Sequence, residues 1–433
     1  MNIRHLFLAA AVILAAGAAD AQPARPRENW IGAWGFAVVP PPPGVVMPMA
    51  APAIVPLAPL QAAATPPTPL VENPGNVPVV VLTSDPSNVT IRQLARVSAA
   101  GKRIRLRFTN EGGSDVLSLG AVHVGIASPD GAVVSGSDRI VTFNGMSSVV
   151  IPAGAPLLSD PVDLPVKALD RLLISSFLPG SAARTGHSML HYISEGGDHT
   201  GAAQMPAQKL ARLAALVSEI DVDATTATNV VVTLGDSITD GATSTANAFR
   251  SYPDRLAERL APAGKWAVVN VGIGGNRLLR YGTAPNALAR LDRDVLSVPG
   301  VKTIILLEGI NDIGQSFKTT GVPDPVSLEA LIAADKQIIQ RAHDHGIKVI
   351  GATLTPYQGT GYASPAGEQV RTGLNNWIKT SGAFDGVVDF AAATADAANP
   401  LAFRPDYNIT DKLHPNDAGY QAMANAIDLG LFK

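Results

Sequence analysis

The second half of the chain alternates short aliphatic runs with longer segments in which apolar residues recur every three or four positions. The runs have the length and β-branched content of buried strands, and the longer segments have the period of amphipathic helices. The expected strand and helix pairs are 230–234 and 249–260, 267–271 and 287–296, 303–307 and 328–345, 348–354 and 368–380, and 386–390 and 417–429. Apolar strands separated by helices predict a parallel sheet covered on both faces. We therefore expect a flavodoxin-like three-layer α/β/α sandwich with a five-stranded parallel sheet over residues 229–433.

Between residues 89 and 192 the apolar positions recur every second residue instead. Residues 103–108 read Arg-Ile-Arg-Leu-Arg-Phe, an alternation typical of a strand with one wet and one dry face. Further runs at 117–126, 132–143, 147–151 and 171–178 are separated by Gly, Pro, Asp and Asn. This pattern predicts an all-β, jelly-roll-like sandwich, which we assign to residues 22–206. Arg103, Arg105 and Arg107 could bind an acidic polymer, but a solvated strand face is their expected role.

Three segments of different composition adjoin these two units. Arg4 and His5 precede an apolar run and then small residues at 19–21, which predicts a signal peptide over 1–21 and an exported protein, periplasmic or extracellular. That run is too short for a spanning helix, so no stable membrane insertion is expected. Residues 40–78 are rich in Pro and Ala and predict an extended insertion. Residues 207–219 have a helical pattern, which predicts a helix within a connector at 207–228.

Composition removes several classes of function. The 433 residues include 33 Lys and Arg against 36 Asp and Glu, a balance that provides no basic face for nucleic acid. The absence of cysteine excludes disulfides, thiolate catalysis and cysteine-ligated zinc. Carboxylate and histidine metal sites stay open on composition alone. Nothing in the sequence assigns an oligomeric state.

The turn after the first strand of the second half is the strongest candidate for chemistry. Residues 230–241 read Val-Val-Val-Thr-Leu-Gly-Asp-Ser-Ile-Thr-Asp-Gly, so an apolar strand stops abruptly at Gly235, Asp236 and Ser237. Glycine permits a sharp exit from a strand, and the free N–H groups of a following helix would surround Ser237 with positive partial charge. Ser237 is therefore a candidate nucleophile and oxyanion donor, and a capping turn is the alternative without chemistry.

A serine nucleophile needs a base, and histidine is the usual one near neutral pH. Of the eight histidines, His414 follows the fifth expected strand and should share a sheet edge with Ser237. Asp411 stands three residues earlier, where its carboxylate can accept a hydrogen bond from the imidazole and leave Nε2 for the serine. A helix-capping aspartate beside a surface histidine is the alternative interpretation.

Acyl transfer also needs hydrogen-bond donors for an oxyanion, and two further strand ends offer them. Residues 270–276 read Asn-Val-Gly-Ile-Gly-Gly-Asn, a glycine-rich turn that can bring a backbone N–H close to a ligand. A dinucleotide-binding loop would need glycine where Arg277 stands, so that rival fails. Residues 309–312 read Gly-Ile-Asn-Asp, in which the Asn311 amide is a candidate donor and an asparagine turn is the alternative.

Together, the motifs Gly-Asp-Ser, Asn-x-x-x-x-Gly-Asn, Gly-x-Asn-Asp and Asp-x-x-His closely resemble those of the SGNH hydrolase family, also called the GDSL esterases and lipases. The resemblance covers residues 229–433, and the β-rich part before them looks like the N-terminal extension of some exported bacterial members. An α/β-hydrolase would need Gly-x-Ser-x-Gly, which no serine of this chain satisfies. The resemblance implies a catalytic triad of Ser237, His414 and Asp411, an oxyanion hole of Ser237, Gly275 and Asn311, and supporting roles for Asp236, Asn276 and Asp312.

The function that the resemblance implies is hydrolysis of carboxylic esters through an acyl-enzyme, without a metal or another cofactor. The loops at 243–249, 277–285, 315–325 and 357–362 follow strand ends and contain few charges, which favours a small-molecule or carbohydrate substrate with a short acyl or acetyl group. The alternatives are acyl transfer to a sugar hydroxyl, a lysophospholipase and a non-catalytic carbohydrate-binding protein.

Overall fold

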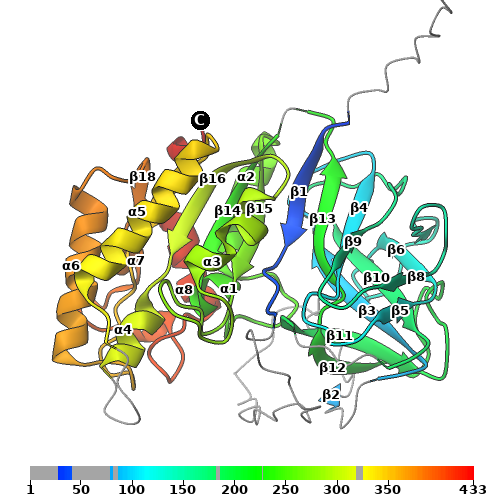
Figure 1. Ribbon diagram of the computed structural model, residues 1–433, viewed down its shortest axis with the longest axis horizontal. Coiled ribbons are helices and arrows are strands. Elements are labelled where there is room, and N and C mark those ends of the chain that lie inside the picture. The colour runs from blue at the N-terminus through cyan, green and yellow to red at the C-terminus, as the bar shows by residue number, and fades with distance from the viewer. Residues whose placement is uncertain (1–27, 41–78, 81–85, 182–185, 227, 318–324) are drawn as a thin grey trace, which may run out of the picture.

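A computed structural model describes residues 28–40, 79–80, 86–181, 186–226, 228–317 and 325–433. In these residues an all-β part and an α/β part lie side by side (Figure 1). The signal peptide expected at 1–21, and all of the segment at 40–78 except Pro40, fall outside the described residues. Export therefore stays a prediction. Each helix among the described residues is too short or too polar to cross a membrane.

The α/β part is built on a five-stranded parallel sheet, as the alternation of strands and helices predicts. Its strands lie in the order β15, β14, β16, β17, β18, and every neighbouring pair is parallel. Their bounds are Asn229–Gly235 for β14, Trp266–Gly272 for β15, Val301–Leu307 for β16, Lys348–Ala352 for β17 and Gly386–Val388 for β18. Because β14 lies between β15 and β16, the strand order reverses there. The carboxyl ends of these strands are where such a sheet binds ligands.

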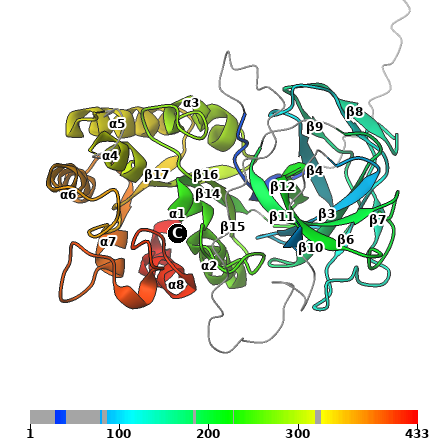
Figure 2. The ribbon, with the colours of Figure 1, turned by 90° about the horizontal axis from the view of Figure 1, so that it is seen from below.

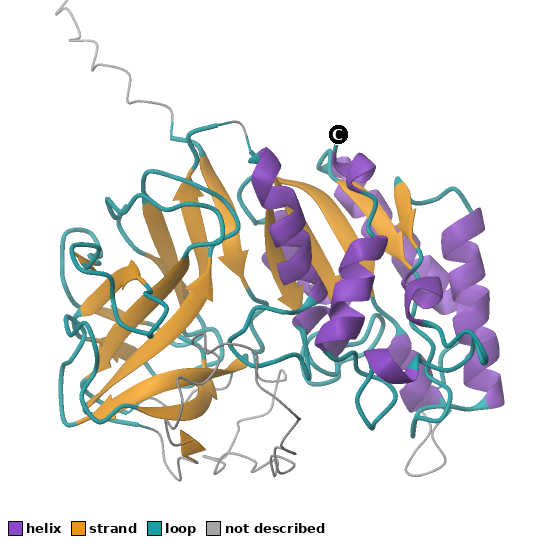
Figure 3. Cartoon of the chain, turned by 180° about the vertical axis from the view of Figure 1, so that it is seen from behind, coloured by secondary structure: helices purple, strands orange, loops and turns teal. Residues whose placement is uncertain are grey.

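Helices cover both faces of this sheet, with α3 and α5 on one face and α2 and α8 on the other (Figure 2). Figure 3 shows the helices gathered in this part of the chain, beside the strands of the all-β part. The helices are α1 (Ser237–Asp240), α2 (Tyr252–Leu260), α3 (Ala287–Leu291), α4 (Ile310–Ser316), α5 (Leu328–Asp344), α6 (Pro365–Thr380), α7 (Phe390–Thr394) and α8 (Asp417–Ala426). A π-helical turn, Asp292–Leu296, continues α3. Side-chain caps fix several of the starts. In α2, Ser251 and Asp254 form a reciprocal capping box.

The all-β part consists of antiparallel sheets, as the period-two pattern predicts. One sheet contains β1 (Trp30–Gly35), β13 (Val217–Asp223), β4 (Ile104–Thr109) and β9 (Pro156–Leu158), in that order. A second contains β2 (Val79–Val80), β12 (Lys209–Ala214), β11 (Ser188–Glu195), β3 (Val89–Arg96), β10 (Arg171–Leu178), β6 (Val122–Ile126) and β7 (Arg139–Ile140). A short pair joins β5 (Leu117–Leu119) to β8 (Val149–Ile151). Within the described residues, β2 and β12 form the one parallel pair of this part.

The helix expected at 207–219 is wrong. These residues form β12 and the start of β13, which pair antiparallel with β11 and with β1 and β4. Their apolar residues fit a helical period and a strand about equally, so periodicity alone cannot decide between them. The strand is formed because β13 fills the centre of a four-stranded sheet, and such pairing overrides local propensity. Most of the expected connector at 207–228 therefore belongs to the β-sheets.

Two expectations about the strands of the all-β part also need correction. The run at 132–143 is largely turns, because Gly131 and Gly136 take positive φ values of 82° and 79° and only Arg139–Ile140 pairs as a strand. The face formed by Arg105 and Arg107 of β4, with Arg103 just before the strand, is ion-paired rather than simply solvated. These side chains contact Asp223, Asp221 and Glu111 at 2.6, 2.7 and 2.9 Å.

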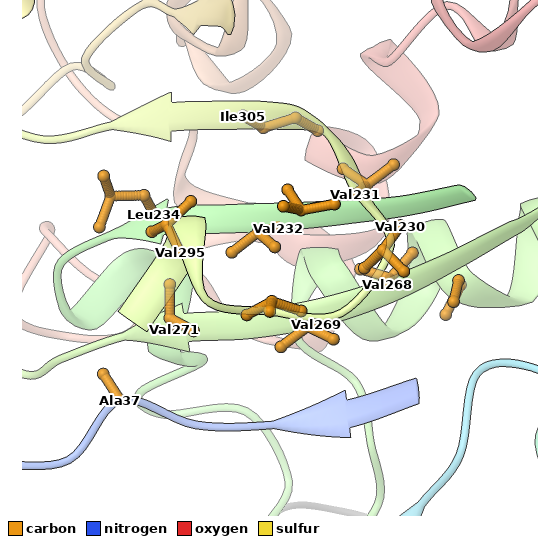
Figure 4. Packing of buried hydrophobic residues seen from close by; sticks show 14 of the residues in the cluster. Ala37, Val230, Val231, Val232, Leu234, Val268, Val269, Val271, Val295 and Ile305 are labelled. Carbon is orange, nitrogen blue, oxygen red and sulfur yellow. The ribbon is translucent and has the colours of Figure 1, made fainter. Parts of the chain in front are cut away.

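The two parts share one hydrophobic core. Figure 4 shows Val269 and Val271 of β15 on the side of the parallel sheet that faces β1 and the segment after it, where Ala37 lies nearest to Val271. Ser98 Oγ donates a hydrogen bond to the Val268 carbonyl and accepts one from the Val268 N–H, both at 2.9 Å. The all-β part thus covers β15, which would otherwise be an exposed edge of the sheet.

Candidate active site

Ser237 stands where β14 turns sharply into α1. The Asp236 side chain caps α1, and its Oδ1 accepts a hydrogen bond from the Ile238 N–H at 2.9 Å. Gly235 has no room for a side chain, because a Cβ there would collide with the Leu307 carbonyl and the Thr239 side chain. The close packing of this turn fixes Ser237 beyond the carboxyl end of the sheet, at the N-terminus of a helix.

The structure brings Ser237, His414 and Asp411 into one hydrogen-bonded line. Ser237 Oγ lies 2.8 Å from His414 Nε2, and His414 Nδ1 lies 2.6 Å from Asp411 Oδ2. With the Nδ1–H donating to the carboxylate, Nε2 is an acceptor for the serine hydroxyl. Asp411 and His414 belong to one loop, and His414 follows Ser237 by 177 residues in the sequence.

The loop around Asp411 holds the carboxylate ionised. Burial opposes the charge, but hydrogen bonds from the His414 ring and from the N–H groups of His414 and Leu413 outweigh it and lower the pKa of Asp411. Both of these N–H groups donate to Oδ1, at 3.0 and 2.9 Å. Oδ2 is thereby left for the imidazole. A neighbouring bridge between Asn408 and Pro415 closes the base of the loop.

The two expected sources of oxyanion donors lie at the ends of β15 and β16. Gly275 has a φ of 73°, a left-handed conformation that glycine adopts at little cost. Asn311 is in the first turn of α4 and is buried, and its Nδ2 donates to the Asn276 carbonyl at 2.9 Å. An amide nitrogen carries two N–H groups, so the second Asn311 N–H stays available to a ligand.

The remaining expected site residues hold these turns together. The carboxylate of Asp312 accepts hydrogen bonds from the N–H groups of Leu278 and Leu279, at 2.7 and 3.1 Å, and so ties α4 to the glycine-rich turn. Burial raises the pKa of Asp312 despite those bonds. The Asn276 side chain is fully buried and donates to the Pro285 carbonyl at 2.9 Å. Their contacts are structural, within the wall of the site.

Comparison with known proteins agrees with this arrangement of motifs. The sequence profile of the GDSL-like Lipase/Acylhydrolase family matches residues 233–422. The chain contains a GDSL-like lipase/acylhydrolase domain. The resemblance seen in the sequence is thereby confirmed, and the GDSL domain places the chain among the carboxylic ester hydrolases.

The chain is also similar to solved structures of a lipase and of an esterase. A GDSL-like lipase from Bacteroides thetaiotaomicron is 20% identical, with 47% of this chain and 88% of that chain covered and a TM-score of 0.35. An acetylxylan esterase from Geobacillus stearothermophilus is 21% identical, with 47% and 93% covered and a TM-score of 0.37. No curated protein matches the chain.

The GDSL domain contains a buried arginine that the sequence did not single out. Arg290 of α3 is 1% exposed, and its guanidinium donates to the Gly235 carbonyl, the Val271 carbonyl and Asn276 Oδ1 at 3.0, 2.7 and 2.8 Å. One side chain therefore connects the nucleophile turn to both ends of the glycine-rich turn. In the sequence, Arg290 lies in an amphipathic helix, where a charged residue is normally on the solvated face.

Glu308 is the second residue that sequence reasoning missed. It ends the apolar run of β16, its side chain is fully buried, and its Oε2 lies 4.0 Å from Arg290 Nη2. Burial, with the nearby Asp236 carboxyl, raises the pKa of Glu308 well above its ordinary value despite Arg290. A charged residue at the end of an otherwise apolar strand was the one signal that could have identified it.

The all-β part also contacts the nucleophile helix of the GDSL domain. His187, just before β11, lies with Nε2 3.1 Å from Oδ1 of Asp240, the last residue of α1. Burial opposes protonation of this imidazole, but Asp240 outweighs it and the pKa of His187 is raised.

Among the residues that the structure describes, no three His, Asp or Glu side chains gather as ligands for a metal ion.

The turn at residues 235–237, between β14 and α1, should also make the free energy of unfolding depend on pH. Burial, strengthened by the Asp312 carboxylate, raises the pKa of Asp236 from 3.8 to about 7. The folded chain then keeps a proton that the unfolded chain releases, so the stability that this group contributes is present below about pH 4 and is lost as the pH rises through about 7. Asp236→Asn keeps the oxygen that caps α1. We expect it to reduce the loss of unfolding free energy between about pH 5 and 8 by about 1 kcal/mol or more.

Urea unfolding of the wild type and of Asp236→Asn at both pH values measures this difference. Asp344→Asn, at the exposed end of α5, is the matched control and should leave the pH dependence unchanged. An Asp236→Asn variant whose stability falls as steeply as that of the wild type would contradict the assignment.

Proposed function

We propose that the chain is a serine esterase that cleaves its substrate through a covalent acyl-enzyme, with Ser237 as nucleophile, His414 as base and Asp411 as its partner. The observation that carries the proposal is the line of hydrogen bonds from Asp411 through the imidazole to Ser237, at 2.6 and 2.8 Å. If Asp411 only capped a helix and His414 were an ordinary surface residue, nothing would require the hydroxyl of Ser237, from a distant segment, to lie at Nε2.

In the acylation step, His414 Nε2 accepts the Ser237 hydroxyl proton while the oxygen attacks the ester carbonyl carbon. The carbonyl electrons move onto its oxygen, and their return breaks the ester bond. The leaving alcohol takes the proton from Nε2, and the acyl group stays on Ser237. Water then repeats the cycle, with its proton passing to His414 and back to Ser237 as the carboxylic acid leaves. The ionised Asp411 stabilises the imidazolium in both steps.

Three donors stabilise the oxyanion in this proposal: the Ser237 N–H, the Gly275 N–H and the Asn311 amide. The two backbone groups have no acceptor within the described residues, and the third has one N–H to spare. These groups are fixed before the substrate arrives, which is what makes such donors effective. One donor of this kind contributes about 3 kcal/mol of transition-state stabilisation.

The substrate in this proposal is a short-acyl ester, with acetylated carbohydrates as the favoured class. The loops at 243–249 and 357–362 contain no charged residue, and the turn at 277–285 adds only Arg277 and Arg280. Walls with so few charged residues favour an uncharged substrate over a phospholipid head group, because most of the wall offers no partner for a charge that loses its hydration.

A panel of 4-nitrophenyl esters of increasing acyl length, with an acetylated oligosaccharide and a lysophospholipid, tests the proposal. We expect the acetyl ester to have the highest kcat/KM among the nitrophenyl esters, and acetate rather than a new ester as the product when a sugar acceptor is added. A preference for long acyl chains or the lysophospholipid would contradict the substrate class. Transfer of the acyl group to the added sugar would contradict hydrolysis.

A further inference from the structure

A cavity of about 570 Å³ opens beside the loop that carries Asp411. Its walls come from the loop after β17, with Gln358 and Gly359, and from the segment 396–412 that follows α7. Both segments lie beyond the carboxyl ends of sheet strands, the same edge as Ser237. The volume is within the range of about 300 to 1,000 Å³ that is typical of sites for small ligands.

Lys412 links this cavity to the triad. It directly follows Asp411 and has a φ of 59°, a left-handed conformation that is unfavourable for a residue with a long side chain. While the Asp411 carboxylate contacts His414, the Lys412 side chain lines the cavity and packs over Gly359, where a Cβ would lie 3.2 Å from Lys412 Cδ. No hydrogen bond or ion pair engages the Lys412 ammonium within the described part of the chain.

Other polar groups on the cavity wall are fixed in place but only partly satisfied. Asn399 Nδ2 donates to Gln358 Oε1 at 2.7 Å, which orients the Gln358 amide and leaves its Nε2 without an acceptor among the described residues. Asp396 Oδ1 accepts from the Ala398 N–H at 3.0 Å, and its Oδ2 has no protein donor in the same set. The cavity therefore presents donors at Gln358 and Lys412 and an acceptor at Asp396.

The rest of the lining decides what kind of ligand matches these groups. Phe403, Pro405 and Ile409 supply apolar surface between the polar side chains. The one cation, Lys412, and the one anion, Asp396, among the lining residues balance each other. A neutral molecule that has hydroxyl groups to donate and accept, and C–H faces to pack on apolar side chains, matches this combination. A phosphorylated ligand would bring its charge next to Asp396.

We propose that this cavity binds the alcohol part of the ester and that this alcohol is a neutral polyhydroxylated molecule, such as a saccharide. The inference rests on the proposed esterase function and deepens it. It assigns specificity to Gln358, Asp396 and Lys412, which lie outside the triad and the oxyanion donors. A simple aryl ester, which has no hydroxyl groups for the cavity, is hydrolysed without these contacts.

Two substrates separate the cavity from the catalytic groups: 4-nitrophenyl acetate and an acetylated xylo-oligosaccharide. Gln358→Ala and Lys412→Met should each lower kcat/KM for the oligosaccharide about tenfold, mainly through KM, since a hydrogen bond from an amide or ammonium group is lost. Both variants should hydrolyse 4-nitrophenyl acetate within about twofold of the wild-type rate. Gln340→Ala and Lys348→Met, exposed residues on α5 and β17, are the matched controls and should change neither substrate.

Equal losses on both substrates, or no loss on the oligosaccharide, would overturn the cavity assignment. A wild type that hydrolyses 4-nitrophenyl acetate but not the oligosaccharide would overturn it as well, and would leave the esterase proposal intact. The esterase proposal fails separately if the wild type hydrolyses neither ester and a fluorophosphonate does not label Ser237.

Discussion

Replacement of Ser237 by alanine is expected to reduce kcat for 4-nitrophenyl acetate by about 10⁴-fold or more, because the acyl-enzyme can no longer form. The variant keeps the Ser237 backbone N–H, so the three oxyanion donors should remain. Some rate above that of the uncatalysed reaction should therefore survive, since donors and binding alone contribute about 10³ to 10⁴-fold in serine hydrolases. Steady-state kinetics measure the loss, and labelling by a fluorophosphonate should disappear with it.

The fold of the variant must be intact for this loss to be interpreted. Within the described residues, the Ser237 hydroxyl makes its hydrogen bond with His414, so the free energy of unfolding measured in urea should change by less than about 1 kcal/mol. Ser147→Ala, an exposed serine in a turn of the all-β part, is the matched control and should keep full activity. A Ser237→Ala enzyme that retains the wild-type rate would contradict the role of this residue.

The α/β half was predictable because its strands are buried on both faces. A strand such as β14 then appears in the sequence as a continuous apolar run, and its end is visible where Gly235 interrupts that run. Ser237, Asn311 and His414 could be found for a related reason. Ser237 and Asn311 closely follow apolar strands, and His414 lies in the segment after α7, beyond the last strand. Parallel strands bring their carboxyl ends to one edge, so these segments can meet there.

The all-β half was less predictable because antiparallel pairing depends on residues far apart in the sequence. β13 pairs with β1 across nearly two hundred residues, as the bridge between Trp30 and Asp223 shows. No local pattern could indicate that 217–223 would fill the gap between β1 and β4. Without that partner, the apolar residues of 207–219 fit a helix equally well.

Arg290 and Glu308 could not be predicted because their importance depends on burial. A charged side chain in an amphipathic helix is normally solvated, and nothing near Arg290 in the sequence indicates otherwise. Its acceptors, Gly235, Val271 and Asn276, come from two other segments. The fold alone creates a space in which carbonyl oxygens and a buried carboxyl need a fork of donors, and arginine is the side chain that supplies one.

Replacement of Arg290 by methionine is therefore expected to have a large effect on both stability and rate. Methionine fills most of the volume but leaves the Gly235 and Val271 carbonyls without their donors and removes the guanidinium that lies 3.3 Å from the buried Asp294 carboxylate. We expect the free energy of unfolding to fall by about 3 to 5 kcal/mol, the scale for breaking a buried charged contact. Because the guanidinium fixes the turns that carry Ser237 and Gly275, kcat should fall by about 10²-fold while KM changes little. Urea unfolding and kinetics with 4-nitrophenyl acetate measure the two effects.

Two comparisons separate positioning of the site from general stability. Arg341→Met removes hydrogen bonds from a half-buried arginine of α5 to the Leu288 carbonyl and to Asp292, and should cost less than about 1 kcal/mol with an unchanged kcat. Fluorophosphonate labelling of folded Arg290→Met, at a temperature well below its unfolding, should be slowed in step with kcat, because labelling uses the same nucleophile turn. A merely structural residue would lower the free energy of unfolding without affecting Ser237. If the folded variant is labelled and hydrolyses 4-nitrophenyl acetate at the wild-type rates, Arg290 therefore stabilises the fold and does not position the site.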